Sequence, residues 1–235
     1  MNPIEHNMSD PSIALIVGAS RGLGLGLVRE YLNRRWRVIA TERRPGSSAA
    51  LASLATKALT IEALDIDDEA AIAALAERLA GTSLDLLFVN AGVSDDPTVP
   101  IGQVRTDEFD RVMHTNALGP MRVVERLSNI VAQRGTIAVM TSGLGSVSSE
   151  PSAGYDVYGA SKAALNRLMR GYAVRAGSDR TLLLVMPGWV KTDMGGDKAP
   201  LDVATSVRGI PDAIAARSGA SGLTFIDHNN AVMPW

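Results

Sequence analysis

The sequence predicts an α/β domain with a doubly wound parallel sheet of about seven strands and helices on both faces. Short, mostly apolar runs recur along the chain, the first of them (13–17) wholly apolar, as expected of strands that helices cover on both sides. Segments with the apolar spacing of helices lie between these runs, which indicates crossover connections between parallel strands. The 235 residues are 46% hydrophobic and 20% charged, a composition that can bury one continuous core.

Taken in order, the expected strands are the apolar runs 13–17, 38–40, 59–64, 84–89, 136–140, 182–186 and 223–226. The expected helices are 23–32, 69–79, 108–128, 157–172 and 203–216, the last with Pro211 inside it. No shift in composition marks a linker, so we expect a flexible N-terminal extension, residues 1–12, followed by one domain over residues 13–235. Loops rich in Gly, Ser and Pro follow two strand ends, at 142–154 and 195–200, where ligands bind in open α/β sheets.

Composition and charge exclude several classes of function. The 23 basic and 25 acidic residues form no basic stripe, so we expect no nucleic-acid partner. Cysteine is absent, which excludes disulfides and thiolate chemistry, and the three histidines show no metal-ligand spacing. The first dozen residues carry no apolar signal or membrane segment, so we expect a cytoplasmic protein.

A glycine-rich turn, Gly18-Ala-Ser-Arg-Gly22-Leu-Gly24, follows the first expected strand. Such a turn brings the backbone close to a phosphate, and the next helix presents its free N–H groups and partial positive charge to the anion. We therefore expect the pyrophosphate of a dinucleotide here, in contact with Gly18, Ser20, Arg21, Gly22, Leu23 and Gly24. The alternative is a turn that serves only to pack the strand tightly against the helix.

Tyr158, Lys162 and Ser142 are the groups needed to move a proton onto a carbonyl oxygen. A tyrosine has a pKa of about 10, and an ammonium one helical turn away favours the phenolate and lowers that pKa. Ser142, at the end of the fifth expected strand, would donate a hydrogen bond to the carbonyl oxygen. The alternative is a surface pair on a helix, since residues four apart always share one face.

Asn116 lies in the expected helix 108–128, four residues before Pro120. Proline has no N–H, so the backbone carbonyl of Asn116 is left free and the helix is expected to be distorted there. The alternative is a kink that only fits the helix around its neighbours.

The turn spacing Gly-x-x-x-Gly-x-Gly, with Asn90-Ala91-Gly92 after the fourth strand and Pro187-Gly188 and Thr192 after the sixth, resembles the classical short-chain dehydrogenases/reductases over residues 17–194. Val89 departs from the Asn-Asn-Ala-Gly motif of that family by replacing its first Asn. The resemblance implies a Rossmann-type fold, a nicotinamide cofactor and a small-molecule carbonyl or alcohol substrate. It also implies a catalytic tetrad of Asn116, Ser142, Tyr158 and Lys162, in which the Asn holds a water that links the Lys to solvent.

The same resemblance implies most of the cofactor contacts. Asp65 and Ile66 would lie beside the adenine, and the remaining contacts would be Asn90, Ala91, Gly92, Tyr158, Lys162, Pro187, Gly188, Val190 and Thr192. Asp65 or Asp67 could instead cap the next helix. The segment 227–235 resembles the small carbonyl-reductase subgroup related to the C-factor proteins, and the family likeness implies a homo-oligomer, dimer or tetramer.

The residues after the second expected strand bear on which nicotinamide binds. Thr41 stands where NAD-type members of the family place an acid, and Arg43 with Arg21 could bracket a 2′-phosphate, so we favour NADP(H). In the alternative, Arg43 and Arg44 are solvated, Glu42 reaches the ribose and NAD(H) binds.

Several further residues border the expected cleft. We expect the adjacent Asp95 and Asp96 to be solvated and Tyr155 to pack or line the substrate mouth. The apolar side chains there either touch substrate or fill core: Val93, Leu144, Trp189 and Met194. The predicted function is an NADP(H)-dependent oxidoreductase that interconverts a carbonyl and an alcohol, with a nucleotide-binding signalling or scaffold protein as the alternative.

Overall fold

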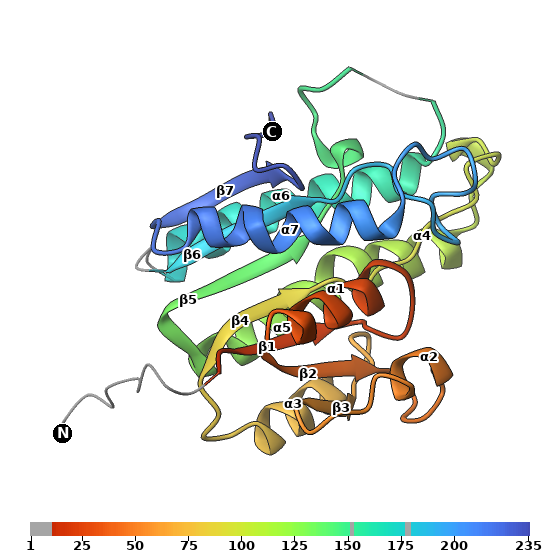
Figure 1. The fold of residues 1–235 in the computed structure, drawn as a ribbon. Coiled ribbons are helices and arrows are strands. Elements are labelled where there is room, and N and C mark those ends of the chain that lie inside the picture. Colours follow the sequence, from red (N-terminus) through yellow and green to blue (C-terminus); the bar gives the residue numbers. More distant parts are fainter. Residues whose placement is uncertain (1–10, 151–152, 177–179) are drawn as a thin grey trace.

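Seven parallel strands form one sheet in the computed structural model, which describes residues 11–150, 153–176 and 180–235 (Figure 1). The strands are β1 (Ile13–Val17), β2 (Arg37–Glu42), β3 (Leu59–Ala63), β4 (Leu84–Val89), β5 (Val131–Met140), β6 (Thr181–Met186) and β7 (Gly222–Asp227), in the order β3-β2-β1-β4-β5-β6-β7. The strand order reverses between β1 and β4, and in such sheets the crevice beyond the carboxyl ends of these strands holds the ligand. The predicted doubly wound α/β fold is confirmed.

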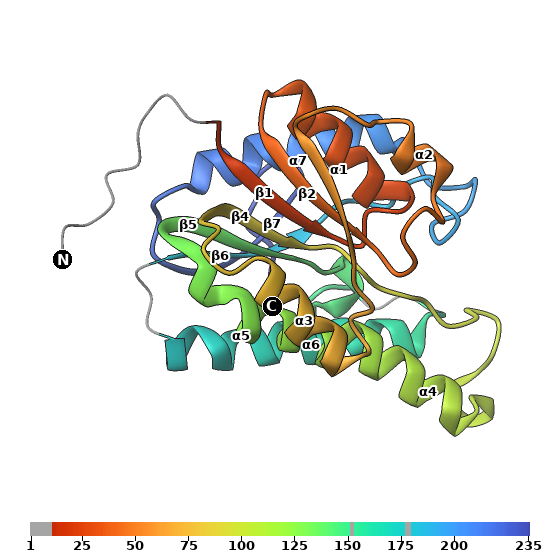
Figure 2. The same cartoon turned by 90° about the horizontal axis from the view of Figure 1, so that it is seen from below.

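Helices cover both faces of the sheet (Figure 2). One face carries α1 (Gly22–Asn33), α7 (Val203–Arg217) and the short α2 (Ala49–Ala52), and the other carries α3 (Glu69–Arg78), α4 (Thr106–Met113), α5 (Gly119–Leu127) and α6 (Asp156–Ala176). Short 3₁₀ segments are η1 (Ile101–Gln103), η3 (Ser128–Ile130) and η4 (Gly143–Gly145).

The strands alternate their side chains between two hydrophobic cores. In β1, Leu15 and Val17 pack with α3, α5 and α6, while Ala14 and Ile16 pack with α1 and α7. Successive side chains of a strand point to opposite faces, so a strand covered on both sides must be apolar throughout. This is why β1 reads as a continuous apolar run.

The expected helix 108–128 is three elements in the structure: α4, a π-helical turn η2 (His114–Leu118), and α5. Pro120 lies at the start of α5 and cannot donate to the carbonyl of Asn116, so the regular helical bonding is interrupted there. The expected distortion at Asn116 is confirmed.

The structure departs most from the expected elements at the start of β5 and in the helix α2. β5 begins at Val131, which pairs with Leu84 of β4, and the register then shifts before Thr136 pairs with Leu86, an irregularity that an apolar pattern does not reveal. The helix α2, which Ser48 caps through the Leu51 N–H, was not expected. Of the expected flexible extension, residues 1–10 lie outside the described part of the chain. No helix within the described residues is long and apolar enough to cross a membrane.

Candidate active site

The glycine turn is held between the ends of β1, β2 and β4. A Cβ at Gly18 (φ +82°) would lie 2.8 Å from the Cα of Ala91, and a Cβ at Gly24 would lie 2.0 Å from the Gly18 carbonyl oxygen. Neither position has room for a side chain. The Asn90 amide donates to the Gly18 carbonyl at 2.8 Å, and the Gly18 N–H donates to Thr41 Oγ1 at 3.0 Å. Two neighbouring strands therefore fix the turn against α1.

The N-terminus of α1 is open to a ligand. Arg21 is its N-cap residue, no side chain of the described residues caps the helix, and its first turn contains no acidic residue. Free N–H groups at a helix start attract an anion. The chain thus presents an uncapped helix end beside the glycine turn, and the residues there fit the pyrophosphate of a dinucleotide.

Thr41 and Glu42, at the end of β2, face inward. Thr41 is 1% exposed and its hydroxyl supports Gly18, as described above. The Glu42 carboxylate accepts hydrogen bonds from the Gly46 and Ser48 N–H groups at 2.5 and 3.0 Å. Glu42 therefore holds its own loop instead of facing the cleft, and Arg43 is the first exposed charged side chain after β2.

Arg21 forms an ion pair that the sequence does not indicate. Its guanidinium lies 2.6 Å from the carboxylate of Asp193, in the loop that follows β6, and both side chains are more than three-quarters exposed. Thr192, in the same loop, faces Gly22. The ion pair joins the loop after β1 to the loop after β6, so the Arg21 guanidinium is engaged by Asp193 in this structure.

The cap of α3 comes from Asp68, whose carboxylate accepts the N–H groups of Ala70 and Ala71. Neither Asp65 nor Asp67 caps this helix, which corrects the alternative drawn from the sequence. Asp67 instead binds the π-helical turn, accepting from Thr115 Oγ1 at 2.6 Å and lying 3.1 Å from His114 Nδ1. Asp65 is half-buried at the end of β3, and Ile66 beside it is buried.

Asn116 is fully buried in η2, and its amide is fixed from two sides. Its Nδ2 donates to the Val93 carbonyl at 2.7 Å and to Ser161 Oγ at 2.9 Å, and its Oδ1 accepts the Val93 N–H at 2.8 Å. A Cβ at Gly92 would lie 3.2 Å from Asn116 Oδ1 and 3.4 Å from Lys162 Nζ. Asn116, Gly92 and Lys162 therefore meet at one point.

Lys162 is 3% exposed, and its Nζ donates to the Met140 carbonyl at 3.0 Å. Burial disfavours the charged ammonium and lowers the pKa of Lys162 to about 8. The Nζ atom lies 5.7 Å from the centre of the Tyr158 ring.

The Tyr158 hydroxyl is hydrogen-bonded to Ser142. Burial raises the pKa of Tyr158 to about 12, and the Ser142 hydrogen bond lowers it by less. Lys162 was expected to bring the pKa of Tyr158 below its usual value, and this expectation is wrong for the structure because loss of hydration at the phenol outweighs the favourable contacts. Tyr158 is held as the neutral phenol, the form that donates a proton.

Two further residues support the site and were not recognised in the sequence. Ser161 is fully buried and donates to the Tyr158 carbonyl at 2.7 Å while accepting from Asn116. Asp95, expected to be solvated, is 7% exposed and accepts the Tyr158 N–H at 3.0 Å, which corrects that expectation. Asp96 is exposed, as expected. Only the position of Ser161 next to Lys162 gave a local hint, since the Asp95 contact joins residues far apart in the chain.

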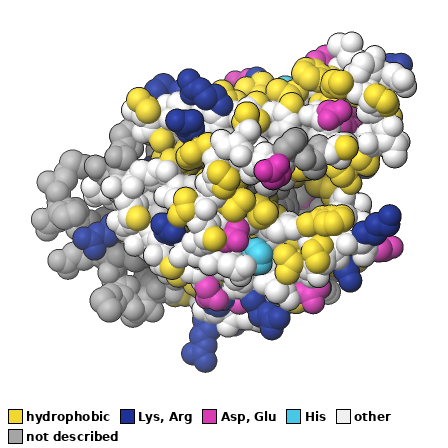
Figure 3. Space-filling model, turned by 90° about the horizontal axis from the view of Figure 1, so that it is seen from above, with side chains coloured by type: hydrophobic (Ala, Val, Ile, Leu, Met, Phe, Trp, Pro, Cys, Tyr) yellow, Lys and Arg dark blue, Asp and Glu magenta, His cyan; other side chains and the backbone are white. Residues whose placement is uncertain are grey.

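Apolar side chains lie exposed on the loops around the tetrad. Leu144, Met194 and Trp189 are 38%, 39% and 56% exposed, so they do not fill core. Val93 is half-buried, and the half-buried Tyr155 ring lies 6.3 Å from that of Tyr158. Hydrophobic side chains gather on the face seen in Figure 3.

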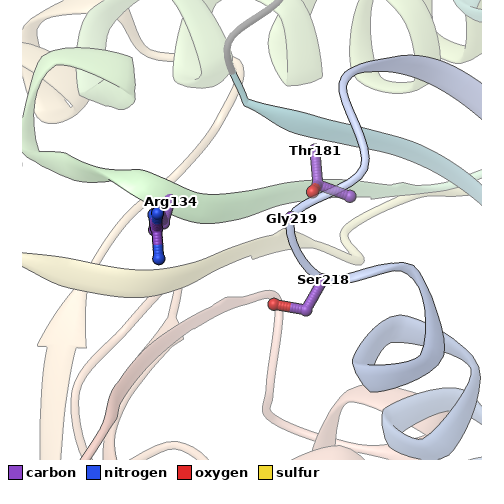
Figure 4. A pocket seen from close by; sticks show the side chains of 4 residues that line it. All are labelled: Arg134, Thr181, Ser218 and Gly219. Carbon is purple, nitrogen blue, oxygen red and sulfur yellow. The ribbon is translucent and has the colours of Figure 1, made fainter.

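A cavity of about 440 Å³ lies at the other end of the strands, between Arg134, Thr181, Ser218 and Gly219 (Figure 4). Thr181 begins β6, whereas Ser142 follows the end of β5, so this cavity is separate from the tetrad. Within the described residues no group of three His, Asp or Glu side chains could hold a metal ion.

Comparison with known proteins agrees with this geometry. Residues 12–201 match the family model for short chain dehydrogenases. The chain is 33% identical to the C-signal protein of Myxococcus xanthus over 165 residues, which cover 69% of this chain and 99% of that protein.

Two crystal structures with NADP bound are similar over the whole fold. One, from Burkholderia multivorans and assigned by name to the short-chain dehydrogenases/reductases, is 44% identical with a TM-score of 0.93 and covers 96% of this chain and 100% of its own. The other, a carbonyl reductase from Pseudomonas aeruginosa PAO1, is 36% identical with a TM-score of 0.89 and the same coverage. The chain belongs to the short-chain dehydrogenase/reductase family.

Proposed function

We propose that this chain is an NADP(H)-dependent oxidoreductase that interconverts an aldehyde or ketone and an alcohol, with reduction as the favoured direction. The observation that carries the proposal is the half-buried Tyr158 phenol, hydrogen-bonded to Ser142 with the Lys162 ammonium beside its ring. When bound, the nicotinamide supplies or accepts the hydride. The chain supplies the proton and orients the carbonyl.

Each member of the tetrad has a distinct role in this proposal. The Ser142 hydroxyl donates to the substrate oxygen and polarises the carbonyl, and Tyr158 gives the same oxygen its proton. The Lys162 ammonium stabilises the phenolate that remains and holds the ribose. Asn116 fixes the loop after β4 and, through the π-helical turn, a water that returns a proton from solvent to Lys162.

The proposed cofactor path runs from the glycine turn to the loop after β6. Asp65 and Ile66 would border the adenine, the residues Gly18 to Gly24 the pyrophosphate, and Val190 and Thr192 the carboxamide. Asn90 and Ala91 form the floor of this path, since both N–H groups bond the Val17 carbonyl at the end of β1. Pro187 and Gly188 would form the far wall of the path. Thr41 lies behind the glycine turn, where its hydroxyl accepts the Gly18 N–H.

NADP(H) is proposed over NAD(H) on charge. Glu42 is withdrawn into its loop, which leaves Arg43 exposed to attract a 2′-phosphate. Arg21 would also bind the 2′-phosphate after breaking its ion pair with Asp193. Breaking it costs little, because an exposed ion pair of this kind is worth only about 1 kcal/mol or less. Two of the similar structures hold NADP.

Replacing Arg43 with alanine is expected to weaken NADPH binding by roughly tenfold and to leave NADH binding unchanged, because only the 2′-phosphate loses a partner. Titration of each cofactor against the tryptophan fluorescence of the protein measures both constants. Arg134→Ala, which removes an exposed arginine at the opposite end of the strands, is the control. A parent protein that prefers NADH contradicts the charge argument.

The proposed reaction is tested by following NADPH consumption with a panel of aldehydes and ketones. Exposed apolar side chains around the tetrad favour carbonyl compounds with apolar substituents. If NADPH binds and no member of a broad panel turns over, the proposal of an active reductase is contradicted.

The likeness to C-signal supports a second candidate, a nucleotide-binding signalling protein with little or no turnover. The two candidates are distinguished by a cellular phenotype in which Tyr158→Phe is compared with deletion of the gene. If Tyr158→Phe restores the parent phenotype in the deletion strain, the signalling role is favoured. If Tyr158→Phe fails to restore it, catalysis is favoured.

We also propose a homo-oligomer, a dimer or tetramer, formed through the helices that carry Asn116 and Tyr158. Exposed apolar side chains lie on this helical layer: Phe109 on α4, Leu118 in η2 and Leu168 on α6 are 41%, 41% and 43% exposed. Light scattering coupled to size exclusion is expected to give a mass above that of one chain. A monomer at micromolar concentration contradicts the proposal.

A further inference from the structure

The loop after β4 is bonded to three helical elements, two of which carry residues of the tetrad. Val93 bonds the Asn116 side chain with both its N–H and its carbonyl, and the Ser94 carbonyl accepts from Arg111 at 2.9 Å. Asp95 then reaches the first turn of α6, where Tyr158 lies. Consecutive residues of this loop are thus fixed to η2, α4 and α6 by hydrogen bonds.

The Asp95 carboxylate caps α6 from outside the helix. One oxygen accepts the Tyr158 N–H at 3.0 Å and the other accepts the Val157 N–H at 3.3 Å. Free N–H groups at a helix start need such acceptors, and a negative charge there also opposes the positive end of the helix dipole. With 7% exposure, the carboxylate is buried against this helix end.

The residue that precedes α6 cannot provide that cap. It is Tyr155, whose ring is unsuited to accept a nearby N–H and whose φ of +59° is rare for a residue with a side chain. The helix start therefore depends on an acceptor from another part of the chain. Asp95, 63 residues before Tyr158, supplies it.

These contacts close a ring of bonds around Tyr158. Asp95 holds its N–H, and Ser161 Oγ donates to its carbonyl at 2.7 Å. Ser161 also accepts a hydrogen bond from Asn116. Asn116 is hydrogen-bonded to Val93, which lies two residues before Asp95 in the same loop. The backbone of Tyr158 is fixed at both its polar atoms, and a small displacement there moves the hydroxyl away from Ser142.

We propose that Asp95 is a positioning residue, which places the Tyr158 hydroxyl by fixing the start of α6. This inference rests on the proposed reductase function. Asp95 acts through the backbone and touches no reacting atom. Its effect falls on the chemical step, because the glycine turn that would bind the pyrophosphate is built from other hydrogen bonds.

The test compares Asp95→Ala, Asp95→Asn and Asp96→Ala. Asp95→Ala is expected to lower kcat for carbonyl reduction by about tenfold or more while the Kd for NADPH changes by less than about twofold, since misplacement of a reacting group slows chemistry. Asp95→Asn keeps an acceptor oxygen and is expected to restore most of the rate. Asp96→Ala, which removes an exposed carboxylate that accepts hydrogen bonds from Thr98 in its own loop, is expected to match the parent.

Hydrogen–deuterium exchange at the start of α6 gives a second reading that does not need turnover. The Tyr158 amide is expected to exchange faster in Asp95→Ala than in the parent, with Asp95→Asn close to the parent. Unchanged exchange in Asp95→Ala, unchanged kcat, or an equal loss of kcat and NADPH affinity would each overturn the inference. Faster exchange in Asp95→Ala, together with a parent protein that binds NADPH and reduces no carbonyl, would instead show that the cap exists and that the proposed reaction is wrong.

Discussion

Replacing Tyr158 with phenylalanine is expected to lower kcat for carbonyl reduction by about 10²–10⁴-fold, the usual contribution of a positioned general acid. Phenylalanine keeps the ring that packs beside Lys162 and removes only the hydroxyl that Ser142 holds. NADPH is expected to bind with nearly the parent affinity, because the glycine turn and the start of α1 are untouched. Steady-state rates and a separate NADPH titration measure the two effects independently.

Tyr155 offers a matched control for this substitution. Its ring lies 6.3 Å from that of Tyr158, yet Gly159, four residues later, provides no ammonium. Tyr155→Phe is expected to retain most of the parent kcat. Equal rates in the parent and Tyr158→Phe, or a larger loss in Tyr155→Phe, would show that another group delivers the proton.

Lys162 is expected to set the alkaline limit of reduction. A lowered pKa of about 8 means that the ammonium is charged below that pH and is lost as the pH rises through it. Tyr158, with its pKa raised to about 12, stays protonated over the same interval. The value of kcat/KM should therefore be level near neutral pH and fall above about pH 8, by up to tenfold for each further unit.

The variants Lys162→Arg and Lys162→Ala separate charge from the other properties of this residue. Arginine stays charged at any working pH, so the fall above pH 8 should disappear in Lys162→Arg even if its rate is lower. Lys162→Ala should be slow at every pH, by about 10²-fold or more. An alkaline limb that stays in place in Lys162→Arg would assign the titration to another group.

Features that follow from short stretches of sequence were predicted well. The apolar runs identified all seven strands because the central strands are covered on both faces, and even the edge strand β3 keeps Leu59, Ile61 and Ala63 apolar. Pro120 predicted the distortion at Asn116, since the missing N–H is a local property of the chain. The glycine turn was equally local, as Gly18 and Gly24 admit no side chain.

Features that depend on contacts between distant residues were not predicted. Asp95 appeared to be one of two solvated carboxylates, because nothing in its neighbourhood indicates that the loop after β4 meets the start of α6. The Arg21 and Asp193 pair likewise joins loops after β1 and β6. The direction of the Tyr158 pKa shift depended on how much of the phenol is buried, which spacing alone does not reveal.

Transfer of deuterium from NADPH labelled at the reactive carbon of its nicotinamide tests the central claim most directly. With an aldehyde that the parent protein reduces, mass spectrometry is expected to find deuterium on the carbinol carbon of the alcohol, and Tyr158→Phe is expected to form almost none of this product. An alcohol that carries no label from either position of the ring, or labelled alcohol formed equally fast by Tyr158→Phe, would contradict proton delivery by Tyr158 beside a hydride-donating cofactor.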